Sequence, residues 1–359
     1  MLTKFKAENY GCLKNVEVDL APVHAFIGPN DSGKSTILHA VRTLGQFAAG
    51  KFDAHPSLKW TPFDPRFGEN RGTTSALHGF GPNGWYSIAA EPSGQTLHEE
   101  FVVLPSAQVH TSTSRAWNQQ SALADASAPE TLAVAAALGP ARLLRLDPDA
   151  LRQPSGLIPY AEAVDFLDDR GAGLPGVLQA IQGRGDDSFQ QLSARVRQVF
   201  PTVKRVGVRP ITRDRLTLET ELTDGTVTTA AQMSEGLLYF LAFAALPWMA
   251  PTSILLVEEP ENGLHPARVA DIVHALRAHS LATNTQVLIS THSPLVIDEL
   301  TADEVTVLTR PSVEAGTKAI PIKATHNFAE RAGVYSLGEL WLSYSDGDQE
   351  EPLFNPRLR

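Results

Sequence analysis

Cysteine is almost missing from this sequence, since Cys12 is the single one among 359 residues. One cysteine excludes an intrachain disulfide and any metal site built from several cysteine thiolates. Long apolar stretches are missing too: the longest, 237–250, is shorter than a membrane-spanning helix and contains Pro247. We therefore expect a buried core helix at 237–250, no membrane partner, and a protein that works in the reducing cytoplasm.

Residues 1–20 contain no uncharged apolar segment of the kind that a signal peptide needs, because charged residues are spread along them. These are Lys4, Lys6, Glu8, Lys14, Glu17 and Asp19. An excess of positive charge is missing as well: the net charge is −10 and the isoelectric point is about 5.6. This balance excludes a protein whose whole surface binds nucleic acid, and leaves room only for a local basic face.

The first part of the chain has the pattern of strands followed by a helix. Residues 2–20 alternate as two short strands around a turn at 9–11, and 24–27 is an apolar strand that leads into a glycine-rich turn. A helix is expected from Ser35. Further along, 253–257 and 286–290 are continuous apolar runs separated by a helical segment, which is typical of buried parallel strands in an α/β sheet.

Two middle segments differ from this α/β pattern. Residues 105–190 are rich in Ala, Ser, Gln and Pro and predict a helical insertion, with helices at 121–138, 159–169 and 174–182. Residues 203–227 return to a period of two, which predicts strands with a hairpin turn at Asp224-Gly225. The expected organisation is a discontinuous core formed by 1–104 and 191–359, the helical insertion at 105–190, and an acidic, polar tail at 345–359.

A phosphate-binding loop is indicated where the strand at 24–27 meets the helix. Gly28-Pro29-Asn30-Asp31-Ser32-Gly33-Lys34-Ser35 fits the pattern G-x-x-x-x-G-K-[ST] in the context that the motif requires. Backbone N–H groups and the helix N-terminus would hold the phosphates of ATP, Lys34 would reach the β- and γ-phosphates, and Ser35 would ligate Mg²⁺. Thr36 is expected to assist at the α-phosphate. The alternative, a plain glycine-rich turn, fits the similar segment 81–84, which has no lysine.

Two carboxylates follow the apolar strand at 253–257. Ligands of open α/β sheets bind at the carboxyl ends of the strands, and this strand delivers Glu258 and Glu259 there. Phosphoryl transfer to water needs one carboxylate that holds hydrated Mg²⁺ and one that orients the attacking water. We assign the first role to Glu258 and the second to Glu259. The alternative is a pair of solvated acids at a strand end.

Two further segments have the chemistry to contact the γ-phosphate. His292 follows the apolar strand at 286–290, where an imidazole can hydrogen-bond the γ-phosphate or position the water, although a lone histidine is more often structural. Ser234-Glu235-Gly236 opens the apolar helix, with Ser234 as its N-cap. A capped helix start is also an anion site. One fold can aim a second helix N-terminus at the same phosphate only if a second copy supplies it.

This ordered set of motifs resembles the ABC-type heads of the structural-maintenance-of-chromosomes (SMC) and RecF-like repair ATPases, and most closely the OLD-like (overcoming lysogenisation defect) AAA ATPases of bacterial and phage defence. The resemblance covers about 1–50 and 200–310 well and the helical insertion poorly. It implies an α/β P-loop ATPase head with an antiparallel N-terminal β-subdomain and an inserted helical lobe.

The resemblance also implies roles for particular residues. Ser234–Gly236 would form the signature that contacts ATP bound to the partner copy, and Glu261–Pro266 would be the D-loop region across the same interface. Glu258 stands where a Walker B strand usually has Asp, and Met-Ser-Glu-Gly departs from the Leu-Ser-Gly-Gly-Gln of transporters. For the Q-loop, Gln95 and Gln108 are both candidates.

Full OLD nucleases add a Toprim domain, whose metal site uses an Asp-x-Asp motif. This chain offers Asp346-Gly347-Asp348, which fits a solvated charge run better, so we expect an ATPase without a nuclease domain of its own. DNA contact is a separate hypothesis that depends on a basic stretch near the predicted strands. Its residues are Arg195, Arg197, Lys204, Arg205, Arg209, Arg213 and Arg215. The alternative is that they form the solvated outer face of a sheet.

These observations predict an Mg²⁺-dependent ATPase that forms a nucleotide-sandwich homodimer or higher homo-oligomer and gates an effector such as a nuclease, in phage defence or DNA repair. Two alternatives stay open: the nucleotide-binding subunit of a membrane transporter, and an ATP-gated DNA-binding scaffold with little turnover. The long separation of Lys34 from Glu259 and the pairing of Glu258 with Glu259 count against the transporter.

Overall fold

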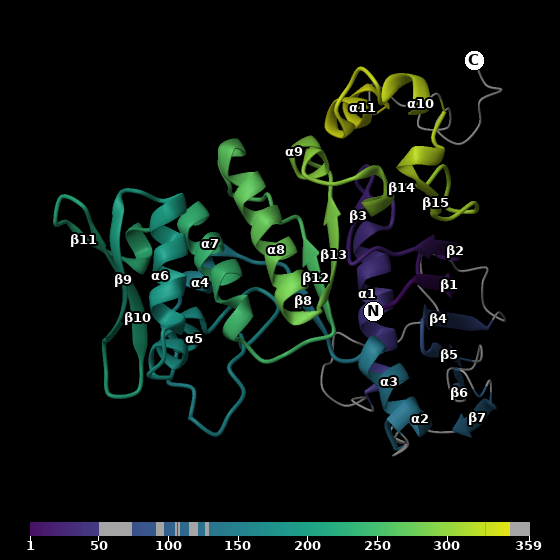
Figure 1. Cartoon of the computed structure of the whole chain (residues 1–359), viewed down its shortest axis with the longest axis horizontal. Helices are drawn as coiled ribbons and strands as arrows, with labels where there is room; N and C mark the ends of the chain where they lie inside the picture. Colours follow the sequence, from purple (N-terminus) through teal and green to yellow (C-terminus); the bar gives the residue numbers. More distant parts are fainter. Residues whose placement is uncertain are drawn as a thin grey trace. The chain divides into compact units, whose positions relative to one another are not determined.

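The computed structural model describes residues 1–49, 74–90, 97–104, 106, 108–114, 121–125, 129–326 and 328–344 (Figure 1). The chain divides into two compact units. Unit 1 comprises Met1–Leu143, Thr252–Leu256 and Asn284–Arg359, and unit 2 comprises Leu144–Pro251 and Val257–Thr283. This division differs from the expected one, because the segment from 105 to 143 supplies strands to the sheets of unit 1.

Unit 1 begins with an antiparallel sheet of six strands in the order β2-β1-β4-β5-β6-β7. The strands are β1 (Lys4–Tyr10), β2 (Leu13–Asp19), β4 (Ser75–Gly81), β5 (Gly84–Ala90), β6 (Leu97–Val103) and β7 (Gln108–Ser114). In β1, Phe5 and Ala7 are buried whereas their neighbours Lys4 and Lys6 are half-buried, as the alternating sequence predicts. The N-terminal antiparallel β-subdomain is therefore present, and the segment 81–84 is its β4–β5 turn.

The second sheet of unit 1 carries the phosphate-binding loop. Its strand order is β15-β14-β3-β13-β12-β8. The strands are β3 (Val23–Ile27), β8 (Ala141–Leu144), β12 (Ile254–Glu258), β13 (Gln286–Thr291), β14 (Val305–Thr309) and β15 (Lys318–Pro321). Both β13 and β14 pair with β3 in parallel, and β3, β12, β13 and β14 are buried along their whole length. This burial explains the continuous apolar runs.

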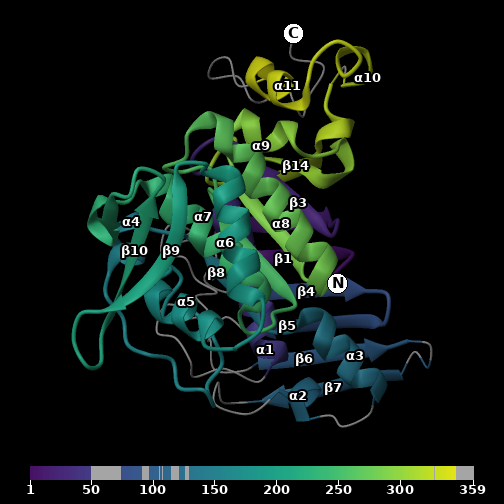
Figure 2. The same cartoon turned by 60° about the vertical axis from the view of Figure 1, so that its left-hand side comes forward.

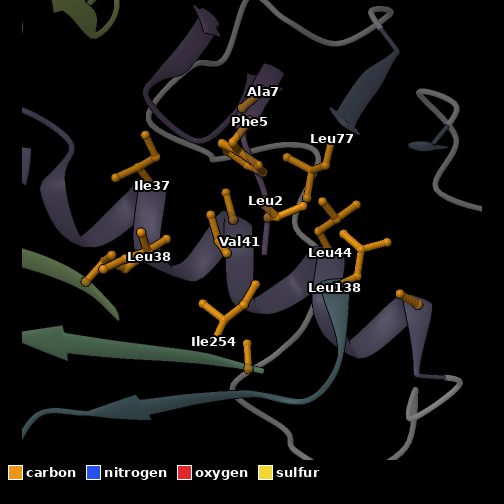
Figure 3. Packing of buried hydrophobic residues seen from close by; sticks show 14 of the residues in the cluster. Leu2, Phe5, Ala7, Ile37, Leu38, Val41, Leu44, Leu77, Leu138 and Ile254 are labelled. Carbon is orange, nitrogen blue, oxygen red and sulfur yellow. The ribbon is translucent and has the colours of Figure 1, made fainter. Parts of the chain in front are cut away.

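Helix α1 (Lys34–Ala48) starts directly after the glycine-rich loop and forms the centre of the unit 1 core. It packs against the antiparallel sheet together with α3 (Pro129–Leu138), and it also contacts β13 (Figure 2). Figure 3 shows the apolar face of α1 among side chains from both sheets. Its labelled residues are Leu2, Phe5, Ala7, Ile37, Leu38, Val41, Leu44, Leu77, Leu138 and Ile254. The helix that begins at Lys34 is thus anchored on two sides.

Unit 2 combines helices with a small antiparallel sheet in the order β11-β10-β9. Its elements are α4 (Pro148–Arg152), α5 (Leu174–Gln182), α6 (Ser188–Val199), β9 (Val203–Pro210), β10 (Leu216–Leu222), β11 (Val227–Thr229), η3 (Ala230–Gln232), α7 (Glu235–Ala245), η4 (Leu246–Trp248), η5 (Pro266–Arg268) and α8 (Val269–Thr283). Helix α7 contacts α4, α5, α6 and α8, so it is buried on all sides from Leu237 onward. The expected core helix at 237–250 is therefore present but shorter, because Pro247 ends it in a 3₁₀ turn.

Two expected helices differ in the structure. The segment 121–138 forms two helices, α2 (Ala122–Asp125) and α3. The predicted helix at 159–169 is wrong, because this segment consists of turns and extended chain. Its acidic side chains bond the local backbone instead: Asp168 Oδ1 accepts hydrogen bonds from the N–H groups of Arg170 and Ala172. Such local bonds compete with a helix.

The last part of unit 1 contains η6 (Ala302–Glu304), η7 (Ile322–Ala324), α9 (Pro294–Asp298), α10 (Phe328–Arg331) and α11 (Leu337–Tyr344). Helix α11 packs on α9, where the Gly338 N–H donates to Asp298 Oδ1 at 2.7 Å. A side chain at Gly338 would collide with the Pro294 carbonyl. The expected tail at 345–359, including Asp346 and Asp348, lies outside the described residues. None of the described helices combines the length and hydropathy of a membrane-spanning segment.

Candidate nucleotide-binding site

The phosphate-binding loop, Gly28–Gly33, connects the central strand β3 to helix α1. Strand β3 lies between two parallel neighbours, so the loop leaves the sheet at the carboxyl ends of β13, β3 and β14. This is the edge at which ligands of α/β sheets bind. Burial lowers the pKa of His24 in β3 to about 4, and its neutral ring shares a hydrogen bond of 2.9 Å with Thr306 Oγ1 of the neighbouring strand β14.

Two glycines of the loop have no room for a side chain. A Cβ at Gly28 would lie 2.2 Å from the carbonyl oxygen of Leu308 in β14. Gly33 is the N-cap of α1 with φ +102°, and its Cβ would lie 2.4 Å from Thr317 Oγ1. A residue that has a left-handed backbone and no space for a Cβ has to be glycine. Steric crowding therefore explains why both of these positions of the motif are glycine.

Lys34 points back over the loop. Its ammonium donates hydrogen bonds to the carbonyl oxygens of Gly28 and Pro29, each at 2.8 Å, and the residue is buried. The loop itself therefore holds the Lys34 ammonium against its first two residues. That Lys34 binds the phosphates stays a prediction of the motif.

The remaining donors of the loop fit a phosphate group. The Ser32 hydroxyl is buried and has no hydrogen-bond partner among the described residues, so it can donate to an anionic oxygen. Ser35 lies exposed in the first turn of α1, and Thr36 Oγ1 accepts a hydrogen bond from Cys12 Sγ at 3.3 Å. A serine hydroxyl together with carboxylate and phosphate oxygens is the ligand set that Mg²⁺ prefers. In the described part of the chain, no three His, Cys, Asp or Glu side chains form a metal site by themselves.

His292 follows β13 directly and is exposed. Thr291 is paired with Ile27 in the parallel ladder between β13 and β3, so the next residue of each strand is His292 on one side and Gly28 on the other. The Ser293 N–H donates to Thr291 Oγ1 at 2.9 Å, which holds the turn that carries the imidazole. The backbone register therefore brings His292 to the start of the phosphate-binding loop.

Glu258 and Glu259 belong to unit 2, although Glu258 is the last residue of β12. Glu258 is buried, with 5% of its side chain exposed, and its Oε2 lies 3.6 Å from the Nε of Arg145. Arg145 comes directly after β8, the strand beside β12. No motif pointed to this arginine. Gln108 lies exposed on β7, in the other sheet, and Gln95 lies outside the described residues.

Glu259 has an unusual backbone conformation, with φ +46°. It begins a turn in which the Asn262 N–H donates to the Glu259 carbonyl at 3.0 Å and Asn262 Nδ2 donates to Glu259 Oε2 at 2.6 Å. A non-glycine residue in this region costs on the order of 1 kcal/mol, and such conformations gather at functional sites. The turn therefore gives the Glu259 carboxylate a fixed orientation.

The signature segment and the D-loop region of the same chain pack against each other in unit 2. Ser234 is the N-cap of α7, and its Oγ accepts a hydrogen bond from the Leu237 N–H at 3.3 Å. Gly263, with φ +70°, has no room for a Cβ because Tyr239 and Glu235 lie within 3 Å of that position. Burial raises the pKa of Tyr239 to about 12, so its hydroxyl stays protonated. The N-cap prediction for Ser234 is confirmed.

Three of the seven residues of the expected basic stretch are paired with acids. On β9, Lys204 bonds Glu221 at 2.5 Å, Arg205 lies 3.4 Å from Glu221, and Arg209 lies 3.4 Å from Glu219, the acids being on the neighbouring strand β10. Other members lie elsewhere: Arg195 stacks over the Trp248 ring, and Arg215 bonds the Pro154 carbonyl. The seven residues therefore do not form one uncompensated basic surface.

Two residues after β14 hold the loop, and no sequence signal identified them. Arg310 Nη1 bonds Asp31 Oδ2 at 3.0 Å. The Thr317 hydroxyl donates to the Ser32 carbonyl at 2.9 Å, and the Thr317 N–H donates to the Cys12 carbonyl at 2.8 Å. These residues lie almost 300 positions from the loop, so only the tertiary structure brings them to it.

Comparison with known proteins agrees with this geometry. Residues 111–298 match the family described as "AAA domain, putative AbiEii toxin, Type IV TA system", and residues 1–80 match the family described as "AAA ATPase domain". The OLD nuclease of Thermus scotoductus is 42% identical over 60 residues, which are 16% of this chain and 10% of that nuclease. The matched part of this chain thus spans about a tenth of the nuclease.

A solved structure of an SMC head, bound to the C-winged helix domain of ScpA, has a TM-score of 0.56 to this chain at 14% identity. The match covers 89% of this chain and 97% of that head. At this identity the likeness concerns the fold alone. Together with the family matches, it confirms the α/β P-loop fold class and the resemblance to OLD-like and SMC-like ATPase heads.

Proposed function

Because the chain belongs to the AAA family described as "AAA domain, putative AbiEii toxin, Type IV TA system", we propose that it binds ATP at the Gly28–Gly33 loop and hydrolyses it to ADP and phosphate. The observation that carries this proposal is the loop itself. It combines two glycines without space for a side chain, the buried Lys34 ammonium above their carbonyls, and the unpartnered Ser32 hydroxyl. These groups are complementary to the anionic oxygens of a phosphate.

The proposed roles follow from the chemistry of each group. Lys34 neutralises charge on the β- and γ-phosphates, Ser35 and Glu258 hold the Mg²⁺ ion, and Glu259 accepts a proton from the attacking water. When bound, Mg²⁺ supplies electrostatic stabilisation of the phosphate oxygens. His292 hydrogen-bonds the γ-phosphate or the water, supported by the register that brings it to the start of the loop. Thr36 assists at the α-phosphate.

We infer that two copies trap the nucleotide between them. The N-terminus of α7, with Ser234, Glu235 and Gly236, would contact the γ-phosphate bound to the other copy, and the D-loop region would line the same interface. The packing of Gly263 against Glu235 and Tyr239 supports this proposal, because it places the D-loop region beside the signature segment, as one shared interface requires. Hydrolysis would then control whether the two copies stay together.

The output of this cycle is proposed to be the control of an effector. Two observations support a nuclease or toxin as the effector: the short match to an OLD nuclease, and the family description, which names a putative toxin. The chain would then act with that effector in phage defence or DNA maintenance. DNA contact through the 195–215 stretch stays a weaker proposal, because Glu219 and Glu221 pair with Lys204, Arg205 and Arg209, three of its seven basic residues.

The test of the proposed activity is ATP binding and phosphate release by the purified chain with Mg²⁺. Lys34→Ala should abolish ATP binding, since it removes the cation held over the loop. Lys318→Ala, at an exposed position of β15, is the control and should bind ATP like the parent. Micromolar ATP affinity in Lys34→Ala would contradict the assignment of the loop.

A further inference from the structure

The phosphate-binding loop carries a negative charge of its own. Asp31 lies in the middle of the loop with φ +65°, and 77% of its side chain is exposed. Aspartate is one of the few residues other than glycine that adopt this conformation readily. A carboxylate in a phosphate-binding loop repels the ligand, however, because it adds to the negative charge that the loop must hold.

Arg310 is placed to offset that charge. Its side chain is 7% exposed and its guanidinium bonds Asp31 at 3.0 Å, so a largely buried arginine meets an exposed carboxylate. It comes directly after β14, the strand whose Leu308 carbonyl touches the Gly28 position of the loop. Attraction between charges is strengthened where one partner is withdrawn from water.

The same segment holds the loop in a second way. The β14–β15 loop (310–317) ends at Thr317, which is buried and bonds the Ser32 carbonyl and the Cys12 carbonyl. Near its middle, the Glu314 carbonyl accepts a hydrogen bond from Lys14. The position of Arg310 is therefore fixed by its neighbours on both sides and does not depend on the Asp31 pair alone.

We propose that Arg310 is a positioning residue of the nucleotide site, which neutralises Asp31 and thereby lets the loop accept the phosphates of ATP. This inference rests on the proposed function. It makes a prediction that a purely structural role for Arg310 does not make. Once Asp31 has lost its charge, Arg310 should no longer be needed for ATP affinity.

The test compares four proteins by calorimetric titration with Mg-ATP: the parent, Arg310→Gln, Asp31→Asn, and the double variant. Arg310→Gln should bind ATP about tenfold more weakly, which corresponds to about 1.4 kcal/mol. Asp31→Asn keeps the shape of the side chain and should bind ATP as tightly as the parent or more so. The double variant should recover to within about threefold of the parent, and the defect of Arg310→Gln should shrink as salt is raised.

Two control variants accompany the test. Arg310→Lys keeps the charge and should stay near the parent, and Lys323→Ala removes an exposed ion pair with Asp303 and should change nothing. If Arg310→Gln does not fold, Asp31→Asn still tests the idea, because weaker ATP binding by that variant would overturn it. A double variant as weak as Arg310→Gln would overturn it too. A parent that binds no ATP would instead refute the proposed function.

Discussion

Glu259 and Asn262 are joined by a hydrogen bond of 2.6 Å from Asn262 Nδ2 to Glu259 Oε2, across a turn in which Glu259 has φ +46°. The amide side chain thus orients the carboxylate to which we assign the proton-accepting role. Because Asn262 belongs to this turn and not to the phosphate-binding loop, we expect it to affect the rate of hydrolysis through Glu259 and not the affinity of a single copy for ATP.

Asn262→Ala should therefore lower the rate of ATP hydrolysis while leaving ATP affinity unchanged. We expect a loss of roughly tenfold in kcat, less than the loss of the carboxylate itself would cause. Steady-state phosphate release and calorimetric ATP titration measure the two quantities. Asn15→Ala, at an exposed position of β2, is the control. An unchanged kcat would show that the Glu259 orientation does not depend on this bond.

Gly33→Ala should reduce both stability and ATP affinity. The new methyl group would meet Thr317 Oγ1 at 2.4 Å, in addition to the cost of a left-handed backbone. We expect the free energy of unfolding to fall by about 1–3 kcal/mol. The matched control is Gly225→Ala, which shares the positive φ but has no atom within 4 Å of its Cβ position. Equal losses in the two variants, measured by denaturant unfolding, would contradict the steric argument.

Arg145→Ala should change the Mg²⁺ dependence of hydrolysis. The Arg145 guanidinium lies 3.6 Å from Glu258, so it would compete with Mg²⁺ for the carboxylate to which we assign the ion. Because the arginine is 76% exposed, the pair is weak, and we expect the half-saturating Mg²⁺ concentration to fall by about two- to fivefold. Arg213→Ala, at an exposed position away from Glu258, should show no such change. A higher Mg²⁺ requirement in Arg145→Ala would contradict the competition.

The sequence was sufficient to predict those parts of the site whose signal is local. The strands at 24–27, 253–257 and 286–290 are continuous apolar runs, and the loop and the Ser234 cap follow from their own residues. The helix expected at 159–169 was wrong because acidic side chains bond the backbone there, which a pattern of hydrophobicity does not register.

Residues that act across long distances in the chain could not be predicted in this way. Arg310 and Thr317 hold the loop only because β14 pairs with β3, and Arg145 meets Glu258 only because β8 lies beside β12. The basic stretch at 195–215 was identified from consecutive sequence alone, without its neighbouring strand. Its neutralising partners, Glu219 and Glu221, became apparent only when the register of β9 against β10 was known.

The central claim is that two copies trap ATP, and Glu259→Gln tests it most directly. This variant keeps the shape of the side chain but cannot accept a proton, so hydrolysis should slow by roughly 10² to 10⁴, or about 3 to 5 kcal/mol of barrier, while ATP binding survives. Unhydrolysed ATP should then hold two copies together.

Light scattering after gel filtration with Mg-ATP should show a stable dimer of Glu259→Gln. Adding Ser234→Arg should return it to the monomer while each copy still binds ATP, because in the proposed arrangement Ser234, besides capping its own helix α7, contacts the nucleotide of the other copy. If Glu259→Gln hydrolyses ATP at the parent rate, or if its assembly state responds neither to ATP nor to Ser234→Arg, the account of a site shared between two copies is contradicted.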